Sequence, residues 1–550
     1  MQESLSVRKA FEGKNVLVTG ATGFVGKVFL SMLLDEVENV GNVHVLVRGG
    51  KDKTATDRLT EMFSTSPAFR PLRAKHGSNL SAFLSAHIDV VDGDVSQPYL
   101  GLTKKAAEKL AKKVDLVIHI AGLTDFEPDP CQAIDINIRG GMNAADVAAM
   151  TPRGRLVHVS TCFVVGNRSG EITETVTPGI APNGKKIDPE TEITALLDAA
   201  KASELTSERK EPKWLKRARV AAGTKFANGL GYPNLYTLSK SLSEQMLATR
   251  TDIALSIARP AIVECAVSYP LPGWNEGVNT SAPLVWLLAS PFRELPARPD
   301  VRFDVIPVDT CCRGLMLISA ASLRNEAEQL YQMGTSQENP LTLGRAIDLT
   351  SLGARKHHMR DGATTLERFV LRYLDAVPVD ADREGPLHVS RLRKLAKNLR
   401  SFVAEVDMKK VLPKPVHAAL GERVTRAQWV THMALQGADM NLRRVEYMLR
   451  LYRPFIHDND WTFSTTSMKK LASRLTSEEK STFGYDVTTI DWRSYWLDTQ
   501  WPGLAKWCLP ILEGEEIPND PPMEPALRLR AKSTTKATTK DADEVEGAHP

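Results

Sequence analysis

Short apolar runs recur along the first half of the chain, and each is followed by a stretch with helical periodicity. The runs lie at residues 15–18, 43–47, 88–91, 115–121, 155–159 and 254–258. Strands that alternate with helices in this way are typical of a doubly wound parallel sheet. We therefore expect an α/β fold of the Rossmann type, with ligands at the carboxyl ends of the strands.

The pattern changes near residue 348, where strand alternation ends and longer helical stretches such as residues 424–451 begin. Aromatic residues gather in residues 461–464 and 491–496. We predict a dinucleotide-binding catalytic domain over residues 11–350 and a mainly helical C-terminal domain over residues 351–515. The last segment, residues 516–550, is polar and low in complexity, so we expect a disordered tail.

A long insert separates residues 161 and 236, and its middle, about residues 191–225, is charged with a helical pattern. One interpretation is a solvated helix with a single apolar stripe. The other is a cap over the active site whose basic face meets an anionic substrate. Both stay open at this point.

Composition restricts the function further. The 550 residues are 42% hydrophobic and 25% charged, with a net charge of +4, which is ordinary for a soluble protein of two domains with extensions. The charge gives no reason to expect nucleic-acid binding. The six cysteines lack Cys-x-x-Cys spacing, so we expect no metal site and a reducing compartment.

Membrane and export signals are also weak. The N-terminus has no apolar signal region. No run approaches the ~18–20 apolar residues that span a bilayer. We therefore expect a cytoplasmic protein.

A glycine-rich turn, residues 19–26, follows the first apolar run and precedes an apolar helical run at residues 28–34. Strand, tight turn and helix are the context in which this pattern binds a dinucleotide. Backbone N–H groups at the helix start would face the pyrophosphate. The alternative is an ordinary glycine-rich loop. The expected cofactor contacts in the turn are Gly20, Thr22, Gly23, Phe24, Val25 and Gly26.

The second apolar run ends in Arg48, with Lys51 close behind. An acidic residue there would bind a ribose hydroxyl, whereas an arginine accommodates a 2′-phosphate. The sequence therefore favours NADPH over NADH, unless Arg48 is only a solvated surface residue. Further cofactor contacts are expected at Asp94, Val95, Ala121, Tyr236, Lys240 and Pro260.

Tyr236 and Lys240 lie four positions apart, on one face of a predicted helix. A lysine cation beside the phenol would favour its ionisation, so that Tyr236 could give a proton to a developing oxyanion. Thr161, at the end of the fifth apolar run, would be a second donor to that oxygen. The alternative for Thr161 is a hydroxyl that caps the next turn. Asn137 and His119 are expected to have structural roles.

These residues resemble the extended short-chain dehydrogenase/reductases, and most of all the fatty acyl-CoA reductases. The matching segments in the first half are residues 19–26, 157–161, 236–240, 258–260, 272–274 and 306–309. Those in the second half are residues 452–455, 461–465 and 490–492. The resemblance covers about residues 11–512. Plant and animal members often have an apolar, membrane-associating C-terminus, whereas this tail is polar, so peripheral membrane contact is left open.

The resemblance implies NADPH-dependent reduction of long-chain acyl-CoA to fatty aldehyde and on to fatty alcohol, with release of CoA. Thr161, Tyr236 and Lys240 would then be the catalytic residues. One alternative is a nucleotide-sugar epimerase or dehydratase, or another extended short-chain dehydrogenase; Arg48 and the helical C-terminal half argue against an epimerase. Another is a non-catalytic dinucleotide sensor, which would need no proton donor such as Tyr236.

Overall fold

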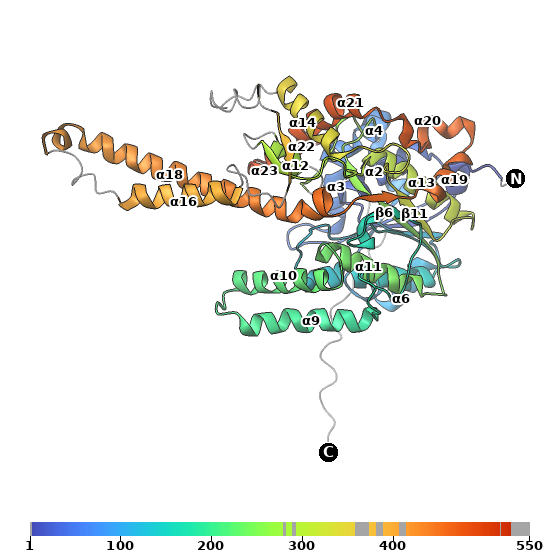
Figure 1. The fold of residues 1–550 in the computed structure, drawn as a ribbon. Coiled ribbons are helices and arrows are strands. Elements are labelled where there is room, and N and C mark those ends of the chain that lie inside the picture. Colours follow the sequence, from blue (N-terminus) through green and yellow to red (C-terminus); the bar gives the residue numbers. More distant parts are fainter. Residues whose placement is uncertain are drawn as a thin grey trace, which may run out of the picture. The chain divides into compact units, whose positions relative to one another are not determined.

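The computed structural model describes residues 3–278, 282–288, 293–357, 373, 375–380, 389–405, 414–517 and 519–529. The chain divides into two compact units. The first unit comprises Met1–Ala282, Asp304–Leu341 and Trp461–Pro550, and the second comprises Pro283–Phe303 and Thr342–Asp460. Figure 1 shows the elements of both. Of the predicted tail, residues 518 and 530–550 lie outside the described residues.

The described part of the first unit is built on a parallel sheet of seven strands, in the order β3-β2-β1-β4-β5-β7-β11. The strands are β1 (Val16–Thr19), β2 (Val43–Val47), β3 (Ile88–Asp92), β4 (Leu116–His119), β5 (Arg155–Val159), β7 (Ala254–Pro260) and β11 (Leu330–Met333). The predicted α/β fold with a doubly wound parallel sheet is confirmed.

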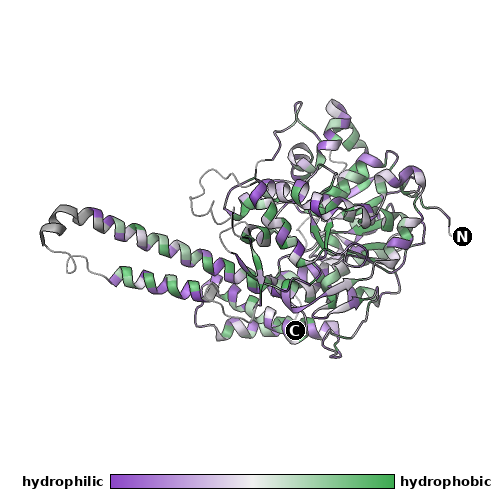
Figure 2. Cartoon of the chain, turned by 45° about the horizontal axis from the view of Figure 1, so that its top comes forward, coloured by the Kyte–Doolittle hydropathy of each residue, from purple (hydrophilic) through white to green (hydrophobic). Residues whose placement is uncertain are grey.

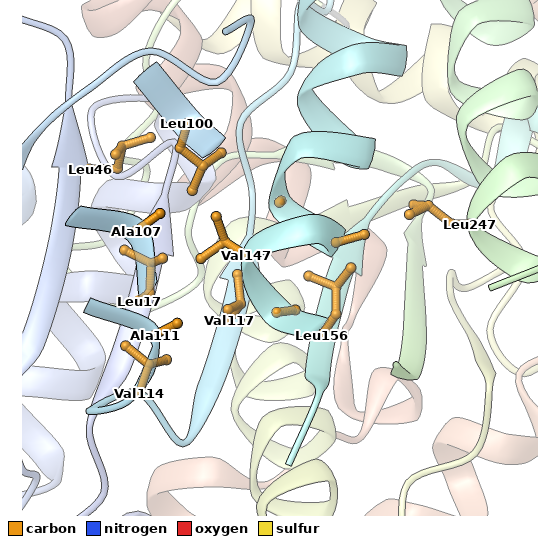
Figure 3. Close-up of a cluster of buried hydrophobic side chains, with 13 residues drawn as sticks. Leu17, Leu46, Leu100, Ala107, Ala111, Val114, Val117, Val147, Leu156 and Leu247 are labelled. Carbon is orange, nitrogen blue, oxygen red and sulfur yellow. The ribbon is translucent and has the colours of Figure 1, made fainter. Parts of the chain in front are cut away.

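The strands form because their residues are apolar on both faces. Every residue of β1, β2, β4 and β5 is buried, as expected for a parallel sheet covered by helices on both sides. One core cluster joins Leu17, Val117 and Leu156 of the strands to Val147 of α8 (Gly140–Ala149) (Figure 3). Each methylene buried in such a core contributes about 0.8 kcal/mol.

Helices α2 (Phe24–Glu36) and α13 (Val308–Leu323) pack against each other, and α8 packs on β4, β5 and α11 (Leu235–Ala248). The other main helices of this unit are α1 (Val7–Phe11), α3 (Ala55–Thr65), α4 (Arg70–His76), α5 (Leu80–His87), α6 (Lys104–Ala111), α7 (Pro130–Ala133), α19 (Thr466–Ser473) and α22 (Trp501–Trp507).

The insert forms two helices, α9 (Pro189–Thr206) and α10 (Pro212–Gly229), which lie side by side (Figure 1). Ile193 and Leu196 of α9 and Ala227 of α10 are buried in a cluster with residues of α11. Arg219 of α10 also donates to Asp129, at 2.5 Å. The insert is thus a helical hairpin with one buried side, close to the interpretation of a solvated helix with an apolar stripe.

The aromatic-rich segment of residues 461–512 belongs to the first unit rather than to a separate C-terminal domain. Strand β13 (Trp461–Phe463) pairs in parallel with β6 (Gly170–Ile172), and the Tyr495 hydroxyl donates to the Cys265 carbonyl oxygen at 2.7 Å. The division therefore differs from the boundary expected after residue 350, because these aromatic side chains are buried against loops of the first unit.

The second unit is mainly helical over its described residues. It contains α14 (Leu343–His357), α16 (Val389–Glu405) and α18 (Lys414–Arg453), and a short parallel pair, β9 (Glu294–Pro296) with β12 (Val377–Val379). The prediction of long helices in this part of the chain is confirmed by α18.

Residues 519–529 pack against α3, α4 and the start of α5, which differs from the disordered tail expected from residue 516. The Asp520 carboxylate accepts hydrogen bonds from Arg70 and Arg73 at 2.5 Å each, and its backbone N–H donates to the Thr65 carbonyl oxygen at 2.8 Å. Leu527 is buried. The local composition, rich in proline and acidic residues, is typical of a disordered tail. It gives no sign of the ion pair between Asp520 and Arg70, which are 450 positions apart.

We predict that Asp520→Ala lowers the free energy of unfolding by about 1–3 kcal/mol, because Arg73 is left without its partly buried acceptor. Ending the chain after residue 517 should cost at least as much. The matched control is Asp135→Ala, which breaks an exposed pair with Arg139 and should cost about 0–1 kcal/mol. Denaturant unfolding of the purified variants measures both. Equal effects of the two substitutions would contradict a structural role for residues 519–529.

Candidate active site

The centre of the site is the place where the ends of β1 and β4 meet. Gly20 follows β1 with a φ of +74°. A Cβ atom at Gly20 would lie 2.4 Å from the backbone nitrogen of Ala121, which follows β4. A Cβ atom at Gly26 would lie 2.1 Å from the Gly20 carbonyl oxygen. Only glycine fits at either position, so the turn has the tight form that a dinucleotide-binding turn requires.

The residues of this turn fit the pyrophosphate of a nicotinamide dinucleotide. Helix α2 begins at Phe24, and its N-cap residue Gly23 offers no side-chain acceptor to the N–H groups of the first turn. Those N–H groups and the helix dipole are therefore available to an anion. Val25 lies in the same first turn, and Thr22 lines a neighbouring cavity.

The side of the site at the end of β2 is rich in basic residues. Arg48 follows β2 and its Nη1 lies 3.3 Å from the Asp94 carboxylate. Burial alone would raise the pKa of Asp94, but hydrogen bonds from Ser96 and the contact with Arg48 outweigh it and hold the pKa below its ordinary value. Asp94 is thus a charged acceptor, and Val95 beyond it packs near Gly140.

A cavity of about 490 Å³ lies beside Thr22. Four of its lining side chains are cations, namely Lys27, Lys51, Lys53 and Arg58. Arg58 of α3 also donates to the Arg48 carbonyl oxygen. The sequence drew attention to Arg48 and Lys51 but not to Lys53 and Arg58. The sequence signal for these two residues is the high density of basic residues directly after β2.

Thr161, Tyr236 and Lys240 come together at the end of β5. Tyr236 lies in the first turn of α11, whose N-cap Asn234 accepts from the Thr237 N–H at 2.9 Å. The Thr161 side chain lies beside the Tyr236 phenol and acts to lower its pKa. Thr161 Oγ1 also accepts from the Phe163 N–H at 3.4 Å, so it caps the next turn as well. The capping contact expected of Thr161 is present, and its role as a donor to a substrate oxygen stays a prediction.

Burial controls the protonation of this group. It raises the pKa of Tyr236 to about 12, and the neighbouring Thr161 side chain opposes part of the rise. It lowers the pKa of Lys240 to about 8, and Glu244 opposes that change. Burial, rather than Lys240, sets the direction of the Tyr236 pKa shift, and Lys240 Nζ donates to the Val159 carbonyl oxygen at 2.9 Å. Tyr236 is consequently a protonated donor at neutral pH.

The loop after β4 forms the wall beside Lys240. A Cβ atom at Gly122 would lie 2.8 Å from Lys240 Nζ. Asn137 fixes this loop, since its Oδ1 accepts from the Leu123 N–H at 2.7 Å and its Nδ2 donates to Ser239 Oγ of α11 at 2.9 Å. Sequence reasoning gave Asn137 only a helix-ordering role and missed that it joins the loop to the helix that carries Tyr236.

Two other residues considered from the sequence, His119 and Pro260, lie in the sheet itself. His119 is buried, its Nδ1 lies 2.8 Å from the Thr19 hydroxyl, and burial lowers its pKa to about 3. It is a neutral core histidine, as predicted. Pro260 ends β7 and pairs with Met333 of β11, and β4 and β5 separate β7 from β1 in the sheet.

Comparison with known proteins identifies the family. Residues 18–315 match a family model of NAD-binding domains described as male sterility protein, and residues 438–510 match a second model with the same description. The chain belongs to this family, the fatty acyl-CoA reductases. The family that the sequence motifs resembled is thereby confirmed.

Several relatives match this fatty acyl-CoA reductase family member over most of its length. The alcohol-forming fatty acyl-CoA reductase of Simmondsia chinensis is 28% identical, over 92% of this chain and 99% of the relative. Fatty acyl-CoA reductase 2, chloroplastic, of Arabidopsis thaliana is 25% identical, over 92% of this chain and 80% of the relative.

Among solved structures, the terminal R domain of the myxalamid PKS-NRPS biosynthetic pathway shares the fold. Its TM-score is 0.50 at 16% identity, and the match covers 92% of this chain and 93% of that domain.

In this family member, aromatic side chains of the second family segment pack on the turn that holds Thr161. The Phe163 ring lies 5.2 Å from Trp461 and 5.4 Å from Phe463, and Trp461 Nε1 donates to the Gly166 carbonyl oxygen at 3.1 Å. The Phe126 ring stacks on Tyr236 at 6.3 Å. The reductase site thus depends on residues about 300 positions apart in the sequence.

The described residues contain no cluster of three or more histidine, cysteine or acidic side chains that could hold a metal ion. Within the same residues, no helix is long and apolar enough to cross a membrane.

Proposed function

We propose that this protein is an NADPH-dependent reductase of long-chain fatty acyl-CoA, which forms the fatty aldehyde and reduces it further to the fatty alcohol. The observation that carries the proposal is that Thr161 and Tyr236 lie together at the end of β5, with Lys240 between that strand end and the loop after β4. Two O–H groups at one place suit the oxygen of a carbonyl under reduction. The names of the curated relatives support a thioester of CoA as the carbonyl compound.

The chain's own residues would act on the substrate oxygen. The bound cofactor supplies the hydride that adds to the thioester carbonyl carbon. Thr161 and Tyr236 donate to the oxygen as its negative charge develops, and removal of such a donor typically costs about 2.7–4 kcal/mol. The C–S bond then breaks, and CoA leaves as its thiolate while the C=O bond of the aldehyde forms. In the second reduction, Tyr236 gives its proton to the alkoxide oxygen, which yields the alcohol.

Lys240 has two roles in this proposal. Its ammonium group lies next to Gly122, where it can hold the nicotinamide ribose, and a bound ribose would compete with the Val159 carbonyl for its N–H donors. Its positive charge also stabilises the tyrosinate that remains after proton transfer. The Phe126 ring beside Tyr236 would restrict the access of water.

NADPH is the proposed cofactor because cations surround the place where an adenosine 2′-phosphate would lie. Arg48 follows β2, and the cavity beside Thr22 is lined by Lys51, Lys53 and Arg58. Arg48 and Lys53 already contact Asp94 and Glu61. A 2′-phosphate would add a further anionic partner for these cations, whereas NADH carries only a hydroxyl at that position.

We also propose a division of labour within the chain. Residues 11–350 would supply cofactor binding and catalysis, with residues 461–512 supporting the turn that holds Thr161. The helical part of residues 351–515 would handle the acyl-CoA substrate and no separate reaction. All six cysteines are free thiols, five of them buried, which suits a reducing compartment, and we place the enzyme in the cytoplasm.

The test of the proposed reaction is its stoichiometry. With a long-chain acyl-CoA and excess NADPH, we expect two NADPH oxidised for each free CoA thiol released. A ratio near one would indicate aldehyde as the final product. Absence of thiol release at full saturation with NADPH would reject thioester reduction.

Tyr236→Phe removes the proton donor and keeps the ring. We expect turnover to fall by about 10²–10⁴, the usual effect of losing a general acid, while NADPH binding is retained. The matched control is Tyr232→Phe. The Tyr232 hydroxyl contacts Ser241 of α11 at 2.7 Å, and the variant should keep the turnover of the wild type. Steady-state rates and NADPH fluorescence measure the two properties. Turnover of Tyr236→Phe near that of the wild type would reject its role as the acid.

Arg48→Asp should reverse the cofactor preference, because a carboxylate repels a 2′-phosphate and accepts a ribose hydroxyl. We expect the ratio of kcat/KM with NADPH to that with NADH to fall by about 10–100-fold, the effect of losing one charge-assisted hydrogen bond. Arg209→Asp, at an exposed position between α9 and α10, is the control and should leave the ratio unchanged. An unchanged ratio in Arg48→Asp would show that another residue selects the cofactor.

A further inference from the structure

Helices α16 and α18 of the second unit form an antiparallel pair (Figure 1). Arg393 near the start of α16 contacts Glu446 near the end of α18, at 2.5 Å. Gln428, earlier in α18, donates to the carbonyl oxygen of Val403 near the end of α16, at 2.6 Å. At the far end of α18, the Arg444 guanidinium lies 5.1 Å from the ring centre of Trp286 in the same unit.

The contact between these two helices is centred on ionic groups. Asp439 of α18 is 2% exposed, and three arginines surround it: Arg443 at 2.8 Å, Arg393 at 3.3 Å and Arg400 at 3.9 Å. Burial alone would raise the pKa of Asp439, but the contacts with the arginines outweigh it and lower the pKa. A helix pair surrounded by water would normally turn its apolar side chains inward instead.

Large apolar side chains of the same helices face outward. On α16 they are spaced four and three positions apart, and on α18 four and seven apart, so each set lies on one helical face. We call them the outer apolar face: Leu395 (55% exposed), Leu399 (44%), Phe402 (67%), Trp429 (63%), Met433 (46%) and Met440 (59%). Figure 2 shows apolar positions, in green, along the coloured parts of both helices. Exposed apolar surface of this extent marks an interaction site.

The charge of the pair indicates the chemistry of the partner. Together α16 and α18 hold twelve lysine and arginine residues against four acidic ones. This surplus of eight positive charges exceeds the net charge of +4 of the entire chain. Helices with a basic polar face and exposed Trp, Phe and Leu bind in the interface of anionic membranes. Lysines and arginines close to such a surface add electrostatic attraction.

We propose that the outer apolar face of α16 and α18 binds the surface of a membrane that contains anionic lipids. Phe402 and Trp429 enter the boundary between headgroups and acyl chains, while flanking cations such as Lys394 of α16 and Arg426 of α18, both exposed, meet the lipid phosphates. A second copy of the chain is a less suitable occupant, because it would bring two large positive surpluses together. The inference goes beyond the proposed reaction and does not depend on it.

The test uses the full chain with no cofactor or substrate, so that its result is independent of the reductase assay. Purified protein is sedimented with vesicles of phosphatidylcholine alone and with vesicles in which about a third of the lipid is phosphatidylglycerol. We expect binding to the anionic vesicles, weaker binding to the neutral ones, and a loss of binding as salt screens the charges. Equal binding to both vesicles, or to neither, would overturn the proposal.

Two variants locate the surface. Phe402→Ser combined with Trp429→Ser should weaken binding to anionic vesicles by at least about tenfold, since two large apolar anchors are lost. Lys394→Glu combined with Arg426→Glu should weaken it by a similar factor. Both pairs of side chains are exposed, so the fold should be kept, and circular dichroism with thermal melting checks this.

The matched control is Leu205→Ser, which removes an apolar side chain that is 74% exposed on α9, beside the basic segment at the start of α10. Its binding to vesicles should equal that of the wild type. If Leu205→Ser abolishes binding and the Phe402/Trp429 variant does not, the surface lies on the α9–α10 hairpin and the proposal is wrong. Light scattering completes the test: self-association that the Phe402/Trp429 variant abolishes would assign the face to a second copy instead.

Discussion

The absence of two Cβ atoms is the constraint on which the rest of the site depends. At Gly20 and Gly26 a side chain would collide with backbone atoms of Ala121 and of Gly20 itself. Because these atoms are so close, β1, α2 and the end of β4 form one rigid junction at the point where the strand order reverses. In sheets of this kind the ligand binds at such a junction. Every other residue of the site is placed relative to it, since β2 and β5 are the outer neighbours of β1 and β4.

Around that junction, burial rather than charge attraction sets the chemistry. The sequence predicted a lysine that makes a tyrosine more acidic, whereas burial raises the pKa of Tyr236 and lowers that of Lys240. Both shifts favour the neutral form of each group. A neutral Tyr236 keeps its proton until an oxyanion appears beside it, whereas Lys240, with a pKa of about 8, is still mostly protonated at neutral pH. The pair therefore combines a neutral proton donor with a cation that can stabilise the tyrosinate left after proton transfer.

The parts of the structure that could be predicted are those written in local patterns. The buried strands, the glycine-rich turn and the Tyr236/Lys240 spacing depend on residues within a few positions of one another. The parts that could not be predicted join distant segments. No local signal couples Trp461 to Gly166, Asp520 to Arg73, or Asn137 to Ser239. For the same reason the aromatic-rich segment was assigned to the helical domain next to it in sequence, although its rings are buried in the first unit.

The helix that carries Tyr236 shows how these distant contacts serve the site. At its start Asn234 caps it, in its middle Ser239 accepts from Asn137, and one turn later Glu244 forms a buried pair with Arg259 at the end of β7. Each contact buries polar groups that would destabilise the fold if a partner were missing. They therefore fix the position of α11 more sharply than apolar packing alone.

In α16 and α18 the same arrangement, ionic groups inside, is combined with apolar groups outside. Because ion pairs hold the two helices together, their large apolar side chains can lie on the outer face. Such an exposed apolar face favours contact with an apolar partner over contact with water. Buried ions thus position a catalytic helix in one unit and, on our proposal, release a lipid-binding face in the other.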